Sequence, residues 1–384
     1  MYVQENMKKI LFVIPEYSHG GTNKSLENLL GLIDKEKYGI FIYCLYEDGD
    51  DYYKRLFAPY MLKKSRLYYW LHDNMLTRKI IGLLNKVTRR DNFVWLYKYE
   101  TRYLQEKYCF DCVIAYQEGM ATKFVSFFSK PTKIAWTHGI DFERRNRNIP
   151  QERAYYEQGR FSHIVCVSET AAVCFRKEFP QLANITIGIH NVVDADKINH
   201  LAQNILFLKD YDPTIFNIIS IGRYNWVKRF DLIPSIARKV CDIIPDVKFK
   251  WYIIGSGEET YEETKEGICK NKVEDIVIQI PAQDNPYPFI KSASLLVSTS
   301  VMESFSYVIA EAKTLHVPVL SVDFPVAHEV LPRTCGWICP INEFSYMLSR
   351  IIMDRDQVYT KMCQNIRDKD SWNEQSLECL YAIL

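Results

Sequence analysis

The sequence lacks the features that would place it in several common classes of protein. No apolar run in its 384 residues approaches the roughly 18 residues that a membrane-spanning helix needs, so no membrane span is predicted. The eleven cysteines follow no framework, because Cys109-x2-Cys112 and Cys335-x3-Cys339 have no second half at zinc-ligand spacing. Scattered thiols of this kind favour a reducing, cytoplasmic location. The net charge is only +1, and charged residues make up 25% of the chain, as in an ordinary globular protein.

Two familiar nucleotide-binding motifs are also missing. The apolar run Ile10–Pro15 predicts a strand, and the pair Gly20-Gly21 precedes a predicted helix from about Asn23 to Ile33. This turn has neither the Gly-x-Gly-x-x-Gly pattern of dinucleotide-binding proteins nor the Gly-Lys-Ser/Thr of a P-loop, which disfavours a simple dehydrogenase. Gly20 and Gly21 still allow backbone N–H groups to come close to a ligand, although a glycine pair in a tight turn is common.

The chain does contain a long alternation of apolar strand candidates with helix candidates. The alternation restarts after a polar, helix-like stretch near 194–210. The strand candidates are Ile10–Ile14, Ile40–Leu45, Cys112–Ala115, Lys133–Trp136, Ile164–Val167 and Ile185–Ile189, then Ile215–Ile221, Phe249–Ile254, Ile276–Ile280, Leu295–Val297 and Val317–Ser321. The pattern predicts an α/β fold of two doubly wound, Rossmann-like domains, 1–205 and 206–367, that face each other across a ligand cleft.

The most informative stretch runs from Ser298 to Ala312 and carries two carboxylates eight positions apart. Glu303 is expected in a polar loop after a strand, and Glu311 about two turns along the following helix. Eight helical residues rise about 12 Å, so the two carboxylates could contact different parts of one long polar ligand, with the helix N-terminus between them as an anion site. A nucleotide sugar has this layout. Taken alone, two such glutamates are more often capping and solvated groups.

A second candidate element is the basic turn from Gly222 to Arg229, between a predicted strand and a predicted helix. The guanidinium of Arg223 offers a planar fork to phosphate oxygens, and Lys228 offers a compact charge. The carboxyl end of a strand in an α/β sheet is also where anionic ligands bind. A solvated basic turn is the alternative interpretation of this element by itself.

His138 is the third candidate. It follows the strand candidate Lys133–Trp136 and precedes Gly139, so it is expected at the carboxyl end of a strand. A single histidine is more often structural than catalytic, and this position raises the odds of a functional role only modestly.

Together these elements resemble glycosyltransferase family 4, the retaining nucleotide-sugar enzymes of the GT-B fold. The matching residues are, in chain order, Gly20, Gly21, His138, Gly222, Arg223, Lys228, Glu303 and Glu311. The two glutamates match the family's Glu-x7-Glu pattern, and the resemblance follows the family's order over nearly the whole chain. One departure is Glu303-Ser304-Phe305-Ser306, where the family often has Glu-Gly-Phe-Gly, and it makes the donor sugar harder to infer.

The resemblance implies a division of roles between the domains. The first domain would lie on the acceptor side, the second would bind the nucleotide sugar, and a terminal helix, about 368–384, would cross back to the first domain. The catalytic residues that it implies are Glu303, His138, Arg223 and Lys228. The donor-binding residues that it implies are Glu311, Gly20, Gly21, Ser304, Phe305, Ser306 and Gly222.

The resemblance also implies the chemistry. A hexose or N-acetylhexosamine would move, with retention of configuration, to a saccharide acceptor, above all a lipid-linked one, in surface polysaccharide or lipopolysaccharide synthesis. A UDP-sugar is favoured over a GDP-sugar, and no metal or other cofactor is expected, because protein cations would balance the phosphate charge. Two alternatives remain open at this point: an enzyme similar to the nucleotide-sugar 2-epimerases, and a non-catalytic relative that binds nucleotide sugar.

The segment 60–108 is basic and rich in aromatic residues. It contains eleven Lys and Arg against four Asp and Glu. Several apolar residues in it could form one face of a helix: Ile80, Ile81, Leu83, Leu84 and Val87. We expect this segment to contact an anionic membrane surface, on the inner face of the cell membrane, with a merely solvated basic surface as the alternative. No nucleic-acid-binding motif accompanies the charge, so a nucleic acid is not expected as a partner.

Overall fold

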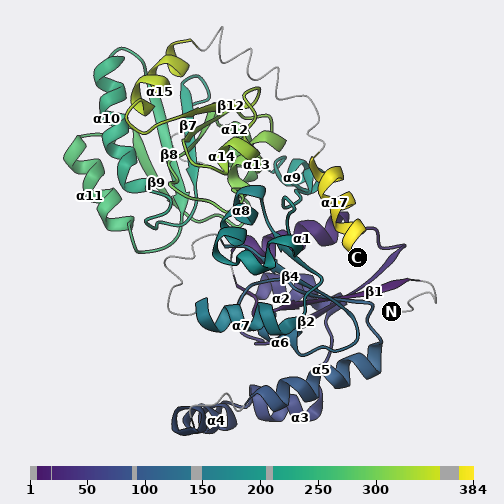
Figure 1. The fold of residues 1–384 in the computed structure, drawn as a ribbon. Helices are drawn as coiled ribbons and strands as arrows, with labels where there is room; N and C mark the ends of the chain where they lie inside the picture. The colour runs from purple at the N-terminus through teal and green to yellow at the C-terminus, as the bar shows by residue number, and fades with distance from the viewer. Residues whose placement is uncertain (1–6, 19, 89–92, 140–148, 205–210, 355–371) are drawn as a thin grey trace. The chain divides into compact units, whose positions relative to one another are not determined.

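The computed structural model describes residues 7–18, 20–88, 93–139, 149–204, 211–354 and 372–384, which form two compact units (Figure 1). Unit 1 comprises Met1–Val192 and Trp372–Leu384, and unit 2 comprises Val193–Ser371. The division falls after Val192, earlier than the expected boundary at 205–206, which lies outside the described residues. It falls there because α9 (Ala195–Leu201) packs against α12 (Tyr287–Ser292) and α13 (Tyr307–Thr314) of unit 2.

Unit 1 is built on a six-stranded parallel sheet with the order β2-β1-β3-β4-β5-β6. Its strands are β1 (Lys8–Ile14), β2 (Tyr38–Cys44), β3 (Cys112–Ala115), β4 (Thr132–Thr137), β5 (His163–Cys166) and β6 (Thr186–Gly188). Residues 10–14 are buried without a break, and so are 112–115, as expected for strands with helices on both faces. The apolar runs of the sequence therefore correspond to the central strands.

Helices and short helical turns connect these strands. They are α1 (Gly21–Leu32), α2 (Asp51–Phe57), η1 (Ala58–Tyr60), α3 (Arg66–Tyr68), η2 (Tyr69–Asp73), α4 (Met75–Thr88), α5 (Val94–Tyr108), α6 (Met120–Ser126), α7 (Ile149–Gly159), α8 (Glu169–Glu178) and η3 (Pro180–Ile185). Within the described ranges, no helix has the length and apolar content needed to cross a bilayer.

The C-terminal helix α17 (Trp372–Ile383) packs in unit 1, beside residues far from it in the sequence. The ring of Tyr381 stacks on that of Tyr38 with 5.3 Å between the centroids, and its hydroxyl accepts a hydrogen bond of 3.0 Å from the backbone N–H of Asp34. Leu380 is buried. These contacts attach the end of the chain to the edge of the first sheet at β2.

Unit 2 repeats the architecture, with a six-stranded parallel sheet of order β12-β11-β10-β7-β8-β9. Its strands are β7 (Phe216–Ile221), β8 (Phe249–Gly255), β9 (Val277–Pro281), β10 (Leu295–Ser298), β11 (Val319–Val322) and β12 (Gly336–Cys339). Its remaining helices are η4 (Phe230–Leu232), α10 (Ile233–Ile243), α11 (Tyr261–Asn271), α14 (Ala327–Val330) and α15 (Phe344–Met353). Each unit is therefore a doubly wound, Rossmann-like α/β domain, as the alternation in the sequence predicts.

Each sheet has a point where the direction of winding reverses. In unit 1 the chain runs from β1 outward to β2 and then returns to β3 on the other side of β1. In unit 2 it runs from β7 outward to β8 and β9 and returns to β10 on the other side of β7. Ligands of open α/β sheets bind beyond the carboxyl ends of the strands at such points. The loops after β1, β3, β7 and β10 are therefore the places where a site is expected.

Candidate functional site

In unit 2, the loops that follow β7 and β10 are tied to each other. The backbone N–H of Val301 donates to the carbonyl of Val227 at 2.9 Å, and the hydroxyl of Thr299 donates to the carbonyl of Lys228 at 2.7 Å. The two strands are neighbours, with Leu295 opposite Ile218. These bonds hold the basic turn against the loop that carries Glu303.

Lys228 and Glu303 form an ion pair between these loops, Nζ to Oε1. The hydroxyl of Ser300 donates to the same Oε1 at 2.9 Å. The two charged side chains are 19% and 15% exposed, so the pair is shielded but open on one side. Within the described residues, the structure records no hydrogen bond to the other carboxylate oxygen, Oε2 of Glu303. That oxygen can accept a bond from a ligand hydroxyl, while an ammonium group has two further N–H donors for a ligand anion.

Gly222 makes room for the stem of Lys228. A Cβ on Gly222 would lie 2.9 Å from Cε of Lys228, and a Cβ on Gly255 would lie 2.0 Å from the carbonyl oxygen of Gly222. The first contact would push the lysine side chain aside, and the second would require a backbone shift. Glycine at both positions therefore allows β7 and β8 to end close together with the lysine stem across them.

The other two cations of the basic turn differ in their surroundings. Arg229 makes a bidentate pair with Asp231, with contacts of 3.0 Å from Nε and 2.9 Å from Nη2, and this hydrogen bonding raises the pKa of Arg229. Its guanidinium is thus already matched by a carboxylate. Arg223 is exposed, and the described part of the chain supplies no ion pair to it. Arg223 can therefore meet an anionic ligand, and so can Lys228, because its ammonium keeps two N–H donors beyond the one that pairs with Glu303.

Glu311 lies in the second turn of α13 and is only 2% exposed. The hydroxyl of Tyr287, on α12, donates to its Oε1 at 3.3 Å. The expectation of one carboxylate in the loop and one along the helix is therefore confirmed by the positions of the two glutamates. The N-terminus of α13 has no side-chain cap, so its first N–H groups can bind an anion.

The segment Ser304-Phe305-Ser306 leads from Glu303 into α13. Phe305 is buried and packs edge-on against Tyr307, with 5.1 Å between the ring centroids. Ser306 has φ 72° and ψ 75°, in the left-handed region that glycine adopts without strain. The backbone at this position therefore has the conformation suited to the glycine that the resembling family often has there.

In unit 1, Gly20 directly precedes α1 and Gly21 is its first residue, and both are exposed. The side-chain N–H of Asn23 donates to the carbonyls of Glu16 and Ser18 at 3.2 and 2.9 Å, which fixes the turn before the helix. A Cβ on Gly20 would meet no atom within 4 Å, so packing alone does not require glycine there. The space beside this backbone is open to a ligand.

His138 follows β4 directly, and its Nε2 is buried without a hydrogen-bond partner among the described residues. Burial lowers the pKa of His138 to about 4, and the carboxylate of Glu118 and a hydrogen bond with the backbone of Tyr116 only partly offset it. The backbone N–H of His138 donates to Oε2 of Glu118 at 2.9 Å. The imidazole is therefore neutral at pH 7 and suited to hydrogen bonding rather than to balancing phosphate charge.

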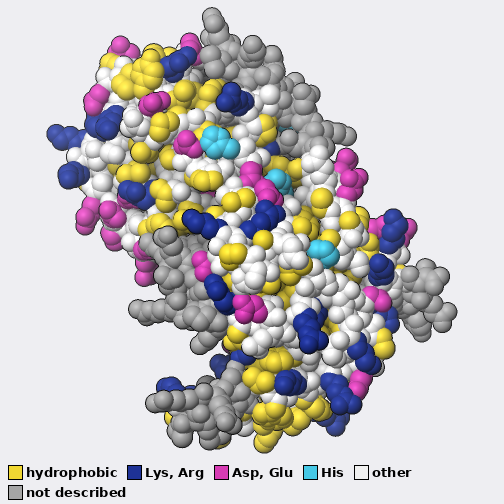
Figure 2. Space-filling model, viewed as in Figure 1, with side chains coloured by type: hydrophobic (Ala, Val, Ile, Leu, Met, Phe, Trp, Pro, Cys, Tyr) yellow, Lys and Arg dark blue, Asp and Glu magenta, His cyan; other side chains and the backbone are white. Residues whose placement is uncertain are grey.

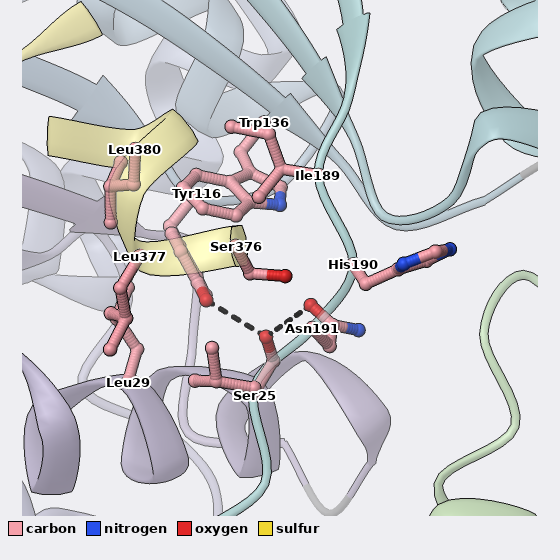
Figure 3. A pocket seen from close by; sticks show the side chains of 11 residues that line it. Ser25, Leu29, Tyr116, Trp136, Ile189, His190, Asn191, Ser376, Leu377 and Leu380 are labelled. Carbon is pink, nitrogen blue, oxygen red and sulfur yellow. Dashed lines mark hydrogen bonds between the residues drawn. The ribbon is translucent and has the colours of Figure 1, made fainter. Parts of the chain in front are cut away.

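Figure 3 shows a narrow pocket of unit 1 that is lined in part by Tyr116. The ring centroid of Tyr116 lies 5.1 Å from that of His138. The hydroxyl of Ser25, on α1, is 2.8 Å from that of Tyr116 and donates to Oδ1 of Asn191 at 2.7 Å (Figure 3). Leu377 and Leu380 of α17 line the opposite side. Because Ser25, Tyr116 and Asn191 are hydrogen-bonded to one another and α17 supplies part of the lining, we assign the pocket a structural role in seating α17.

The structure thus brings together only part of the predicted site. Lys228 pairs with Glu303 and its stem lies beside Gly222, whereas Glu311 follows on the helix after the same loop and no contact joins Arg223 to this pair among the described residues. Gly20-Gly21 and His138 lie after β1 and β4, which are separated in the sheet by β3. Among the described residues no hydrogen bond joins them.

Sequence analysis missed four residues that shape these two sites: Thr299, Ser300, Tyr287 and Glu118. The pair Thr299-Ser300 directly follows the strand 295–298, and Glu118 closely follows the strand 112–115, so their place after a strand was a usable signal. Tyr287 has no such signal, because its contact with Glu311 depends on how two helices pack. Within the described part of the chain, no group of three or more His, Cys, Asp and Glu side chains could hold a metal ion.

Comparisons of the sequence with known proteins point to one class of enzyme. Residues 215–354, all within unit 2, match the family model described as glycosyl transferases group 1. An uncharacterized glycosyltransferase of Methanocaldococcus jannaschii is 29% identical over 46% of this chain and 47% of its own length. One of Haemophilus influenzae is 23% identical over 61% of this chain and 64% of its own length. The chain therefore matches less than two thirds of the length of either relative.

Solved structures establish the fold. Anabaena HepE in complex with UDP has a TM-score of 0.70 at 16% identity, over 97% of this chain and 100% of that chain. S. aureus TarM, in a complex that includes UDP, has a TM-score of 0.70 at 15% identity, over 98% of this chain and 99% of that chain. The fold is GT-B. The sequence matches add that residues 215–354 are similar to glycosyl transferases group 1.

Proposed function

We propose that this protein is a retaining glycosyltransferase of family 4 that moves a hexose or N-acetylhexosamine from a nucleotide-diphosphate sugar to a saccharide. The observation that carries the proposal is the Lys228–Glu303 ion pair at the reversal point of the second sheet. It lies inside the segment that matches the glycosyltransferase model. The complexes of similar folds with UDP and UDP-glucose favour a UDP-sugar as donor over a GDP-sugar.

In this proposal unit 2 binds the donor. Arg223, Lys228 and the uncapped N-terminus of α13 contact the diphosphate, and their charges and N–H dipoles stabilise the negative charge that grows on it as the glycosidic bond breaks. Glu311 accepts hydrogen bonds from the ribose hydroxyls. The free Oε2 of Glu303 accepts a bond from a hydroxyl of the donor sugar. Backbone groups of Ser304–Ser306 line the sugar or phosphate.

Transfer then proceeds on one face of the sugar. The bond between the anomeric carbon and the diphosphate oxygen breaks, an acceptor hydroxyl forms the new bond to the same face, and its proton passes to the departing phosphate. Protein cations balance the charge, so we assign no metal to this step. Unit 1 would supply the acceptor side, with His138 as a neutral hydrogen-bond partner of the transferred sugar and Gly20-Gly21 beside the phosphate or the acceptor.

The acceptor that we propose is a saccharide, in particular a lipid-linked one, in the synthesis of a surface polysaccharide or lipopolysaccharide at the inner face of the cell membrane. A screen of lipid-linked saccharides identifies the acceptor.

The test begins with a thermal-shift screen of nucleotide sugars, because a bound ligand raises the melting temperature by mass action. The best donor is then assayed for acceptor-dependent release of the nucleotide with native protein, Lys228→Gln and Glu311→Gln. Arg238→Gln and Glu262→Gln remove the same charges from exposed positions of unit 2 and serve as matched controls.

We expect both site variants to lose at least about a hundredfold in turnover while both controls keep it. Equal turnover in the native protein, the two site variants and the two controls would refute the assignment of Lys228 and Glu311 to the active site. Incubation of the donor without acceptor addresses the 2-epimerase alternative, since conversion of the sugar itself in that experiment would replace transfer as the function.

A further inference from the structure

Helix α4 of unit 1 turns its apolar side outward. Leu76, Ile80 and Leu83 follow each other at spacings of four and three residues, so they share one face of the helix. Their exposed fractions are 67%, 49% and 63%. Helices of globular domains normally direct such a face into the core. We call these three residues the α4 face.

Polar groups attach the start of α4 to the residues around it. Arg78 lies two positions from Leu76, about 200° around the helix, and its guanidinium stands 5.7 Å from the ring centroid of Tyr46. The hydroxyl of Thr77 donates to the carbonyl of Leu71 at 2.9 Å, and Oδ1 of Asn74 accepts from the N–H of Leu76 at 2.9 Å. These contacts fix the start of the helix, and the α4 face is left in solvent.

Positive charge surrounds the α4 face. Lys79 and Lys86 are exposed, seven residues apart, on one margin of it. Between residues 61 and 88 the chain has six Lys and Arg but a single acid, Asp73. Asp73 is already paired with Lys64 at 2.6 Å and with His72 at 2.9 Å. The basic charge beside the apolar face is therefore not compensated within this segment.

Large aromatic side chains accompany the helix. Tyr69 and Trp70 of η2, immediately before α4, and Trp95 of α5 are exposed. Half of the exposed large hydrophobic side chains in the described chain lie between Leu67 and Tyr99. Figure 2 shows hydrophobic side chains gathered beside Lys and Arg at the end of unit 1 that carries α3 and α5. Tyr and Trp favour the boundary between lipid and water, where one end of the ring is apolar and the other is hydrated.

We propose that α4 binds in the plane of an anionic lipid surface, with the α4 face among the acyl chains and Lys79 and Lys86 at the level of the phosphates. Lysine stems lie along the apolar layer while their ammonium groups reach anionic headgroups. The helix has 14 residues and is about 21 Å long, enough for three apolar side chains to enter on one side but too short to cross a bilayer.

The charge pattern favours lipid over a second copy of this chain. Two α4 faces packed together would bring their lysine margins close without an acidic partner, since Asp73 is engaged. An anionic membrane supplies that counter-charge along its whole surface. Of the other residues expected to form this face, Ile81 is half-buried, and the side chains of Leu84 and Val87 lie outside the described residues.

Flotation of the full chain with vesicles tests the proposal. Vesicles of phosphatidylcholine alone are compared with vesicles of equal parts phosphatidylcholine and phosphatidylglycerol. The variant Leu76→Gln/Ile80→Gln/Leu83→Gln removes the α4 face, and Val173→Gln/Ile243→Gln/Met353→Gln removes three exposed apolar side chains elsewhere. Melting curves check that both fold like the native protein.

We expect native protein and the control to float with the anionic vesicles, and the α4-face variant to bind at least about tenfold more weakly. Lys79→Gln/Lys86→Gln should weaken binding and reduce its sensitivity to salt. Equal flotation of native protein and the α4-face variant overturns the proposal, as does absence of native binding to anionic vesicles. A native dimer that the α4-face variant converts to a monomer also overturns it, in favour of a second copy.

This inference is independent of the proposed transfer reaction. With a water-soluble acceptor and no vesicles, the α4-face variant should transfer sugar at the native rate, because α4 supplies no residue to either candidate site. Loss of vesicle binding with intact transfer therefore supports both ideas, whereas vesicle binding without any transfer supports only the lipid surface.

Discussion

The two units share one architecture but differ in how far their candidate sites are assembled. In unit 2 the loops after β7 and β10 are joined by backbone bonds, by the Lys228–Glu303 ion pair and by Ser300. In unit 1 the candidates follow strands that are not neighbours, and a buried neutral histidine takes the place of a charged pair. The difference teaches that neighbouring strands can fix a charged pair between their loops, whereas loops after separated strands present single groups.

The largest effects should come from breaking the pair in unit 2. Lys228→Gln and Glu303→Gln should each lower kcat by about a hundredfold, because each removes a charge that acts on the reacting sugar phosphate. The double variant should lose little more than either single one, because the two residues act as a unit. The measurement is a double-mutant cycle on kcat. Losses that simply multiply would show that the two side chains work separately.

His138 should make unit 1 sensitive to acid. Its pKa is about 4 in the folded protein and near 6.5 when unfolded, so the unfolded state takes up the proton first as pH falls. The contribution of the neutral His138 to the free energy of unfolding is complete above about pH 6.5. The free energy of unfolding should fall by up to about 3 kcal/mol between pH 6.5 and pH 4. Urea unfolding across this range measures it.

The control for this prediction is His138→Gln, which cannot titrate. It should unfold with a weaker pH dependence than the native protein over the same interval. Identical pH profiles of the two proteins would mean that the imidazole is not held neutral by burial.

Tyr287 tests whether a residue outside the candidate loops of unit 2 positions a residue of the site. It lies on α12, and its hydroxyl donates to Oε1 of Glu311 at 3.3 Å. Tyr287→Phe should raise KM for the donor about fivefold, the worth of one hydrogen bond, and leave kcat nearly unchanged. Tyr346→Phe, at an exposed position of α15, is the matched control. A fall in kcat with constant KM would instead place Tyr287 in the chemical step.

The smallest effect concerns Ser306, whose φ of 72° suits glycine. Ser306→Gly should raise the free energy of unfolding by up to about 1 kcal/mol, because it relieves a left-handed conformation. Ser304→Gly, two residues earlier and not at positive φ, should lower it by about 0.5 kcal/mol through the greater freedom of the unfolded chain. Chemical denaturation of both variants distinguishes these signs.

Much of the fold was predictable from the sequence, for a physical reason. Strands buried on both faces are continuous apolar runs, so Ile10–Ile14 and Cys112–Ala115 could be recognised directly. The place of Glu303 in a loop and of Glu311 in a helix followed from the change of apolar spacing at Tyr307. The division near Val192 could not be predicted in this way, because it depends on α9 packing against α12 and α13.

The sequence predicted the residues of the candidate site better than it predicted which of them form ion pairs with one another. Three cations in the turn 222–229 look equivalent in the sequence, but Arg229 forms an ion pair with Asp231 and Lys228 forms one with Glu303. The second pairing joins residues on loops after two different strands, which only the strand order brings together. An apolar face on α4 was expected from the sequence, but Leu76 was not among its expected residues, and Ile81, which was, is half-buried.

Hydrogen–deuterium exchange with and without the best nucleotide sugar tests the central claim most directly. Bound donor should slow exchange in residues 222–229 and 299–311, where the loops and the start of α13 contact it, and should leave α15, in the same unit, unchanged. Protection confined to other segments, with these two loops exchanging as before, would contradict the assignment of the donor site to the reversal point of the second sheet.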